Sequence, residues 1–241
     1  MPAGRIYQDT ELAIDQLLSL TEAASHYLMR VLRVQSGDGV VIFNGTGGEY
    51  QATIEALSKR CVTVRLVEFH HVDSESPLEL ELGQSLLRGD KMDWVIQKAV
   101  ELGVSVITPL LTERVSVKLQ PDRLQKRLHH WQGVAISACE QSGRCVVPVV
   151  RCPVDVSVWV KSSKTPGFIA SPQAEGSLPK TINSTQARVL IGPEGGLSSK
   201  DIEHCQSDVW YQFSMGPRIL RTETAAISVM TIMQMQWGDL H

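Results

Sequence analysis

The hydrophobic pattern of this chain changes once, at a polar segment near residue 70, and that change limits the folds open to it. Residues 70–77 read HHVDSESP, without periodicity and ending in a proline that disfavours helix at the residue before it. Strand-like alternation precedes the segment, whereas strand and helix patterns alternate after it. The sequence therefore predicts two domains with a linker between them, over residues 1–73 and 77–241.

The first part has the pattern of a small, mainly β module. Residues 39–43 and 49–54 are strand-like and flank the turn sequence NGTGG, and residues 61–67 alternate as a third strand. One helix interrupts the strands, with Thr21 as its cap. Its apolar face is expected to consist of Tyr27, Leu28, Val31 and Leu32. We expect a barrel-like module.

The second part alternates strands with helices, which predicts an α/β domain with a largely parallel sheet and helices on both faces. Strands are expected over residues 78–82, 104–111, 146–150, 167–171, 187–191 and 209–215. Helices are expected from Asp90 to Leu102, from Pro121 to Gly143, from about Ser198, and from Thr222 to Trp237.

Composition excludes several classes of protein. The chain is 43% hydrophobic and 20% charged, as expected of an ordinary globular protein. No apolar run approaches the ~18 residues of a membrane span, and the N-terminal sequence does not resemble a signal peptide, so we expect a cytoplasmic protein. The five cysteines lack metal-site spacing, which indicates reduced packing thiols and no bound metal.

The net charge of −3 provides no general attraction to nucleic acid. Residues 1–76 carry six Lys and Arg against ten Asp and Glu, a balance of −4, and the remainder carries seventeen against sixteen, a balance of +1. Any surface that binds nucleic acid must therefore be a local basic patch.

Two loops that follow expected strands are the best candidates for a ligand site, because open α/β sheets bind ligands at the carboxyl ends of their strands. The first is GPEGG, residues 192–196, whose glycines permit positive φ and close backbone approach. Ser198 can cap the following helix together with Asp201. The loop matches neither the dinucleotide nor the NTPase phosphate motif, and an ordinary turn is the alternative interpretation.

The second loop, residues 214–226, reads SMGPRILRTETAA and opens the C-terminal helix. Arg218 and Arg221 supply positive charge beside a Gly-Pro turn, where an anion or a developing oxyanion could sit. The alternative is structural, with Arg221 and Glu223 forming an ion pair. Two further polar helix ends, residues 97–103 and 140–144, are typical of solvated caps.

An ordered set of segments resembles the RsmE family, the 16S ribosomal RNA uridine N3-methyltransferases. The resemblance covers nearly the whole chain and is carried by RIY (5–7), HYLMRVLR (26–33), GDKM (89–92), QKAVELG (97–103), EQSGR (140–144), GPEGG (192–196) and GPRILRTETA (216–225). It implies a SPOUT-type methyltransferase, with a PUA-like RNA-binding β-barrel domain at the N-terminus and an α/β domain with a C-terminal trefoil knot. It also implies a homodimer and S-adenosyl-L-methionine as cofactor.

The same resemblance implies which residues bind the cofactor: Ala170, Leu190, Gly192, Pro193, Glu194, Gly195, Gly196, Met215, Gly216, Ile219, Leu220 and Arg221. Leu197 stands where the family commonly has an aromatic residue, and Met215 where it commonly has leucine. Both departures preserve an apolar side chain.

In the implied reaction, uridine N3 attacks the methyl carbon of a sulfonium and must lose its proton. The charge that develops on O2 and O4 needs a cation, for which Arg221 is the first candidate. Glu194 and Glu223 are the candidate bases, and the sequence does not choose between them. The expected RNA-binding residues are Arg5, His26, Arg30, Arg33, Arg88, Lys91 and Arg144.

The expected partner is 16S rRNA in the assembled small ribosomal subunit. Two other functions stay open at this point. One is a SPOUT enzyme that methylates a different RNA position or a protein, and the other is an RNA-binding protein without catalytic activity.

Overall fold

The computed structural model describes residues 2–117 and 121–241, and its internal contacts divide the chain into two compact units. Unit 1 comprises Met1–Glu75 together with Cys139–Val147, and unit 2 comprises Ser76–Ala138 and Pro148–His241. A short piece from the second half of the chain therefore belongs to unit 1. A single linker therefore cannot separate the sequence into these two units.

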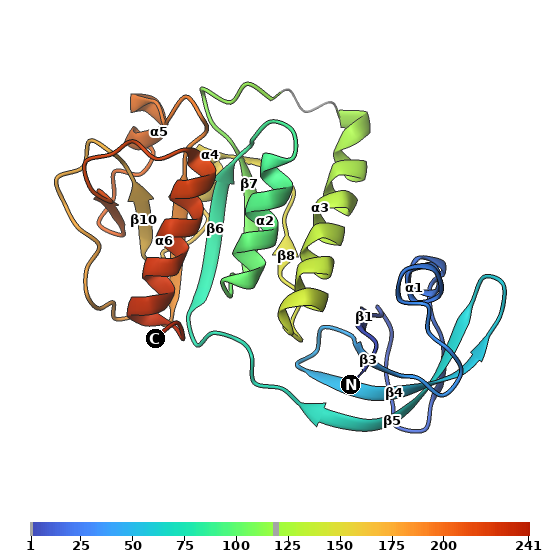
Figure 1. Ribbon diagram of the computed structural model, residues 1–241. Helices are drawn as coiled ribbons and strands as arrows, with labels where there is room; N and C mark the ends of the chain where they lie inside the picture. Colours follow the sequence, from blue (N-terminus) through green and yellow to red (C-terminus); the bar gives the residue numbers. More distant parts are fainter. Residues whose placement is uncertain (1, 118–120) are drawn as a thin grey trace. The chain divides into compact units, whose positions relative to one another are not determined.

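Unit 1 is built on a five-stranded sheet of order β1-β3-β4-β5-β2 (Figure 1). The strands are β1 (Arg5–Tyr7), β2 (Leu17–Ser19), β3 (Gly39–Phe43), β4 (Gly48–Leu57) and β5 (Val62–His71). β1 runs parallel to β3, and the other pairs are antiparallel. The predicted strands are confirmed, but the expected linker begins too early, because His70 and His71 still pair with β4.

The helix of unit 1 begins as α1 (Glu22–His26) and continues as a π-helix, η1 (Tyr27–Leu32). Thr21 caps it, with its Oγ1 accepting from the Ala24 amide at 3.4 Å. Leu28 is fully buried in the core, whereas Tyr27 is 43% exposed and Val31 61% exposed. The expected apolar face is wrong for these two residues, because a π-helix bonds i to i+5 and does not keep the 3.6-residue period.

Unit 2 contains a seven-stranded sheet in which every pair of neighbours is parallel, which confirms the expected sheet type. The order is β12-β10-β11-β6-β7-β8, with β9 also paired to β7. The strands are β6 (Glu79–Ser85), β7 (Val106–Leu111), β8 (Val149–Val150), β9 (Val154–Asp155), β10 (Gly167–Ala170), β11 (Gln186–Ile191) and β12 (Trp210–Phe213). β8 is shorter than the strand expected over residues 146–150.

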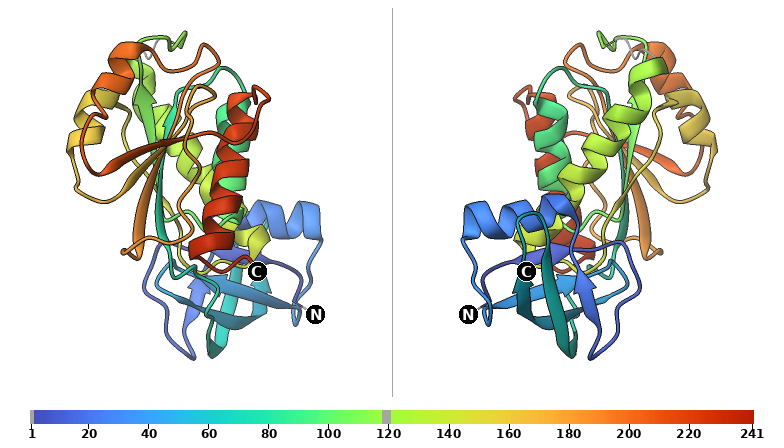
Figure 2. Two further views of the ribbon diagram at one scale, coloured as in Figure 1. Left: turned by 90° about the vertical axis from the view of Figure 1, so that its left-hand side faces the viewer. Right: turned by 90° about the vertical axis from the view of Figure 1, so that its right-hand side faces the viewer.

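Helices cover both faces of this sheet, as predicted. α2 (Lys91–Glu101), α3 (Pro121–Ser142) and α6 (Thr222–Trp237) run side by side on one face (Figure 1). The short helices α4 (Val156–Lys161) and α5 (Ser199–Glu203) lie on the other (Figure 2). α6 begins and ends at the predicted residues. Gly103 and Gly143 take positive φ just after α2 and α3, as expected of helix stops.

Three of the cysteines, Cys139, Cys145 and Cys205, are buried packing thiols, whereas Cys152 is exposed. All five are free, and burial raises the pKa of Cys139 to about 11 and that of Cys205 to about 12. Within residues 2–117 and 121–241, no group of three or more His, Cys, Asp or Glu side chains is arranged to hold a metal ion. None of the helices described has both the length and the apolar composition to cross a membrane.

Candidate active site

A cavity of about 550 Å³ opens at the carboxyl ends of the central strands of unit 2. Three loops supply most of its walls: residues 170–173 after β10, residues 191–197 after β11, and the segment from Met215 to Glu223 that leads into α6. Neighbouring parallel strands end at the same edge of a sheet, so loops far apart in sequence meet there. The two loops singled out in the sequence are thus brought together.

The loop after β11 has a tightly specified path. Gly196 has a φ of +70°, and a Cβ at Gly192 would lie 3.0 Å from the Leu197 side chain. The predicted cap of α5 is confirmed, because the Ser198 amide donates to Asp201 Oδ2 at 2.9 Å and the Asp201 amide donates to Ser198 Oγ at 3.1 Å. The capped helix holds the C-terminal end of this loop in place.

Arg114 lines the cavity from the loop after β7, and the sequence interpretation missed it. Its guanidinium Nη1 donates to the Gly195 carbonyl at 3.0 Å. A Cβ built on Gly195 would lie 3.4 Å from the Arg114 Cβ, so glycine gives the two loops room to approach. The only signal in the sequence was a cation just beyond an expected strand.

The loop before α6 presents backbone and apolar groups to the cavity. Gly216 has a φ of +95°, and the Ile219 side chain is 85% exposed. Among the described residues, the backbone N–H groups of Ile219 and Leu220 have no acceptor. Two free donors beside apolar side chains suit a flat, nitrogen-rich ring.

The first turn of α6 is tied to both neighbouring strands. Arg221 is the N-cap residue, with its side chain exposed and making no cap hydrogen bond. Thr222 Oγ1 donates to the Gly192 carbonyl at 2.5 Å and accepts from Gln84 Nε2 at 3.3 Å. These contacts fix the start of α6 against the ends of β11 and β6.

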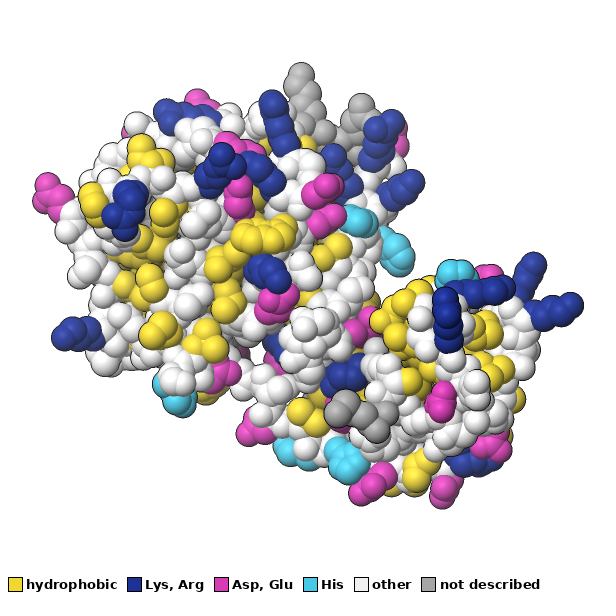
Figure 3. All heavy atoms as spheres, in the orientation of Figure 1, with side chains coloured by type: hydrophobic (Ala, Val, Ile, Leu, Met, Phe, Trp, Pro, Cys, Tyr) yellow, Lys and Arg dark blue, Asp and Glu magenta, His cyan; other side chains and the backbone are white. Residues whose placement is uncertain are grey.

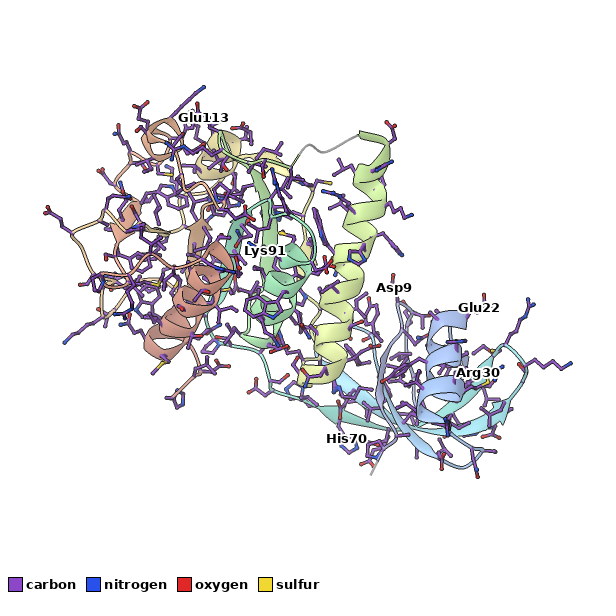
Figure 4. The ribbon with its side chains drawn as sticks, turned by 45° about the horizontal axis from the view of Figure 1, so that its top comes forward. Asp9, Glu22, Arg30, His70, Lys91 and Glu113 are labelled. Carbon is purple, nitrogen blue, oxygen red and sulfur yellow. The ribbon has the colours of Figure 1, made fainter. Side chains whose placement is uncertain are left out.

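Two carboxylates and one ammonium group lie together at the cavity. Lys91, at the start of α2 (Figure 4), places its Nζ 3.4 Å from Glu194 Oε1 and 3.5 Å from Glu223 Oε1. The Glu194 side chain is 38% exposed and that of Glu223 is 15% exposed. Among the described residues, Glu223 pairs with Lys91 and not with Arg221, so the structural-pair alternative for Arg221 is wrong.

Nearly all residues that the resemblance assigned to the cofactor line this one cavity. They are Ala170, Gly192, Pro193, Glu194, Gly195, Gly196, Met215, Gly216, Ile219, Leu220 and Arg221. Leu190 does not line it. Successive side chains of a strand point to opposite faces, so Leu190 is buried in the core beside α4, while Ile191 reaches the cavity.

The cations expected to bind RNA separate into three groups. His26, Arg30 and Arg33 are exposed on the helix of unit 1, where Figure 3 shows cationic and apolar side chains next to one another. In contrast, Arg5 pairs with Glu49 at 2.5 Å, and Arg144, 5% exposed, pairs with Glu75 at 2.5 Å. The third group is in unit 2, where Arg88 Nε donates to Ser116 Oγ at 2.7 Å and Lys91 faces the two carboxylates.

Comparison with known families supports an RNA-directed enzyme. A family described as the RNA methyltransferase domain matches residues 74–234, and one described as the RNA methyltransferase PUA domain matches residues 20–67. The fold is accordingly an α/β methyltransferase fold joined to a PUA-like domain.

Several relatives share the name "Ribosomal RNA small subunit methyltransferase E". The protein of Buchnera aphidicola from Schizaphis graminum is 36% identical, covering 98% of this chain and 97% of its own length. The Bacillus subtilis protein is 30% identical, covering 90% of each chain.

Two solved structures have closely similar folds. A methyltransferase from Legionella pneumophila, in complex with the bound cofactor SAM, is 39% identical with a TM-score of 0.93, covering 98% of each chain. A ribosomal RNA small subunit methyltransferase E from Neisseria gonorrhoeae, bound to S-adenosyl methionine, is 34% identical with a TM-score of 0.91, covering 99% of each chain.

Proposed function

This chain belongs to the family of ribosomal RNA small subunit methyltransferases E, and from that premise we propose that it transfers a methyl group from S-adenosyl-L-methionine to N3 of a uridine in 16S rRNA. The observation that carries the proposal is the cavity of about 550 Å³ lined by the three loops. It combines apolar walls, free backbone donors and the charged side chains that proton removal from a base requires.

The cavity fits the cofactor. The unpaired N–H groups of Ile219 and Leu220 would bind the acceptor nitrogens of an adenine ring, between apolar side chains such as Ile191 and Leu197. When bound, the cofactor supplies an electrophilic methyl group on a sulfonium. The chain's own part is to hold the ring, exclude water and prepare the nucleophile.

Arg221 is proposed to stabilise the negative charge that develops on the uridine oxygens. Its guanidinium lies at the cavity, and no carboxylate of the described residues neutralises it. Glu194 and Glu223 both line the same cavity and are the proposed candidates for accepting the N3 proton.

We propose that the N-terminal part of the chain binds RNA and that the C-terminal part carries out methyl transfer. We propose that residues 1–73 belong to a PUA-like RNA-binding domain, with His26, Arg30 and Arg33 as its exposed cations, and that residues 77–241 belong to a SPOUT domain, of which Cys139–Val147 is packed into unit 1. Arg88 and Lys91 are the proposed RNA contacts of unit 2, and of these two Lys91 lines the cavity. Arg5 and Arg144 are held in ion pairs with Glu49 and Glu75, so we propose that they support the structure of unit 1 and do not bind phosphate.

We also propose the trefoil knot and the homodimer that the family resemblance implies. Support for the knot comes from the path of the chain: after the edge strand β12, it returns to Gly192 at the end of β11, two positions further into the sheet. The substrate is proposed to be the assembled small subunit, in the cytoplasm where ribosomes form.

Mass spectrometry of digested 16S rRNA tests the proposed function. RNA from a strain that lacks the gene should lose one N3-methyluridine, and restoring the gene should return it. Calorimetry on the purified protein should show S-adenosylmethionine binding. Methylation at another position would support a SPOUT enzyme of different specificity, and a chain that binds RNA but no cofactor would be a binding protein.

A further inference from the structure

We propose that Glu223, and not Glu194, is the base that removes the uridine N3 proton, and that Lys91 is the residue that positions it. The inference rests on the proposed function and chooses between the two carboxylates that the sequence left equal. It depends on the hydrogen bonding, burial and support of each carboxylate.

The first observation is an unpaired oxygen. In the described part of the chain, three buried side-chain nitrogen or oxygen atoms have no hydrogen-bond partner: Arg5 Nε, Gln84 Oε1 and Glu223 Oε2. Of these three residues, only Glu223 lines the cavity. Buried polar atoms are nearly always paired, so an orphaned carboxylate oxygen at a ligand cavity indicates a donor that arrives with the ligand. A uridine N3–H is such a donor.

The second observation is that the two carboxylate oxygens of Glu223 have different surroundings. Glu223 Oε1 faces the Lys91 ammonium at 3.5 Å, while Oε2 is the atom without a partner. One oxygen therefore fixes the orientation of the carboxylate and the other keeps its lone pairs free. The arrangement suits proton abstraction, because the carboxylate is held in one orientation and keeps an oxygen that can accept the N3 proton.

Glu194 lacks these features. Its side chain is 38% exposed, against 15% for Glu223, so water can solvate its oxygens. It lies in the loop after β11, whereas Glu223 lies in the first turn of a 16-residue helix. Elements of secondary structure hold reactive groups more rigidly than loops do.

The turn that carries Glu223 is itself anchored. The neighbouring Thr222 is 7% exposed and bonds both the Gly192 carbonyl and Gln84 Nε2. Arg221 precedes it, so the proposed charge stabiliser and the base lie two residues apart at the start of one helix. This places a cation for the uridine oxygens and an acceptor for the N3 proton on one rigid element.

The proton and electron balance of the step is complete. The N3 proton passes to Glu223 Oε2, the nitrogen electron pair forms the N3–C bond, and the C–S bond breaks to leave a neutral thioether. Glu223 then releases its proton to solvent after the product leaves. The Lys91 ammonium keeps its own protons throughout.

The first test compares three glutamine variants using small subunits from the deletion strain as substrate. Glu223→Gln should lower kcat by about 100-fold or more at pH 7 while retaining S-adenosylmethionine affinity and melting temperature. Glu194→Gln should lose less than about tenfold, and Glu203→Gln, an exposed carboxylate on α5, should match wild type. A larger loss in Glu194→Gln, or a Glu223→Gln defect explained by unfolding or lost cofactor, overturns the proposal.

The second test uses a more acidic nucleophile. Subunits reconstituted with RNA containing 5-fluorouridine present an N3–H that ionises more readily, so they need less help from a base. Glu223→Gln should recover at least about tenfold relative to its rate on uridine, and wild type should gain far less. An equal gain in both proteins would mean that Glu223 does not take the proton.

Lys91 is tested by separating kcat from KM. As a positioning residue, Lys91→Met should lower kcat with little change in KM for the subunit, and Lys91→Arg should restore much of the loss. A raised, salt-dependent KM with unchanged kcat would instead make Lys91 a phosphate contact and overturn its assignment.

These outcomes are distinct from failure of the proposed function. If wild type itself leaves the 16S uridine unmethylated, the function is wrong and the variants have no reaction to compare. If wild type methylates N3 but Glu223→Gln does so equally well, the function stands and only the assignment of the base fails.

Discussion

At the scale of single residues, two charged side chains at the cavity, Arg221 and Glu223, differ in exposure and in ion pairing because of their positions at the start of α6. Arg221 and Glu223 are two residues apart, yet one is exposed without an ion pair and the other is mostly buried against Lys91. The difference arises because Arg221 precedes the helix and Glu223 lies within its first turn.

Arg221→Ala should transfer methyl at least about a hundredfold more slowly, because one preorganised donor to a developing oxyanion is typically worth ~10²–10³ in rate. No buried partner is orphaned by the change, so the melting temperature should stay within a few degrees of wild type. The defect should shrink as the pH rises, since uridine N3 then ionises unaided. Steady-state kinetics, calorimetry and thermal unfolding measure these effects.

Arg221→Lys serves as the matched variant, because it keeps the charge but loses the planar fork, and it should fall between alanine and wild type. A large fall in melting temperature with near-normal turnover of the folded fraction would mean that Arg221 serves the fold.

Gly196→Val should reduce S-adenosylmethionine affinity by at least about tenfold. Gly196 has a φ of +70° with open space where a Cβ would be, so the cost is one of backbone conformation and the loop must change its path. Gly37→Val is the matched control, because Gly37 also has a positive φ and open space but lies in unit 1. Calorimetry should show intact cofactor binding in the control; equal losses in both variants would remove the loop from the site.

At the scale of elements, the helix of unit 1 departs most from its expected form. Its second half winds as a π-helix from Tyr27 to Leu32, ending at Arg33 with a φ of +55°. This winding turns Tyr27 and Val31 to the surface beside Arg30. A surface with exposed cations and an aromatic ring suits RNA, where phosphates and unstacked bases are both available.

Replacing Arg30 with Gln and Arg33 with Asn should weaken RNA binding and flatten its dependence on salt. Each duplex phosphate contact contributes about −0.9 to the slope of log K against log salt, so the slope should lose up to about two such increments. Asparagine is chosen at residue 33 because it tolerates the left-handed backbone there. Affinity for a 16S rRNA fragment is measured at several salt concentrations.

The matched control replaces Lys59 and Arg60, exposed on the turn between β4 and β5, with glutamine. It removes the same charge from the same unit and should retain most of the salt slope. Cofactor binding should be unchanged in both. If the helix variant retained wild-type RNA affinity at every salt concentration, the patch would lie elsewhere.

At the scale of the whole molecule, unit 1 is completed by a distant part of the chain. The Tyr7 amide donates to Glu140 Oε1 at 3.0 Å, and the buried Arg144 pairs with Glu75. Residues 139–147 are thereby part of the fold of unit 1, although nearly all of their sequence neighbours belong to unit 2. Arg144 is the one cation of this segment, and we propose that it supports the fold of unit 1.

Arg144→Ala should destabilise the protein by about 3 kcal/mol, because it leaves the partly buried Glu75 carboxylate without its partner. Denaturant unfolding, followed by hydrogen exchange in β3 and β4, should locate the loss in unit 1. Arg127→Ala removes an exposed cation from α3, the helix that precedes Arg144, and should change stability by no more than about 0.5 kcal/mol. Full stability with weakened RNA binding would return Arg144 to the RNA surface.

The sequence by itself determined the local structure of unit 2 and the segments of the site. The strand ending before GPEGG, the Ser198 cap and the bounds of α6 all follow from periodicity, turn chemistry and capping, which act between residues close in the chain. Eleven of the twelve residues expected to bind the cofactor line one cavity, and Leu190 does not, because side chains alternate along β11 and its own is buried in the core.

Tertiary structure alone decided which distant groups became partners. Lys91 lies beside Glu223 because α2 and α6 pack against each other, Arg114 reaches Gly195 from the loop after β7, and Arg144 is buried against Glu75. In the sequence, Lys91 and Arg144 were expected to bind RNA, and Arg114 had no expected role. Pairing and burial depend on the order of strands and the packing of loops, and both are set by the summed contacts of the whole unit rather than by any local pattern.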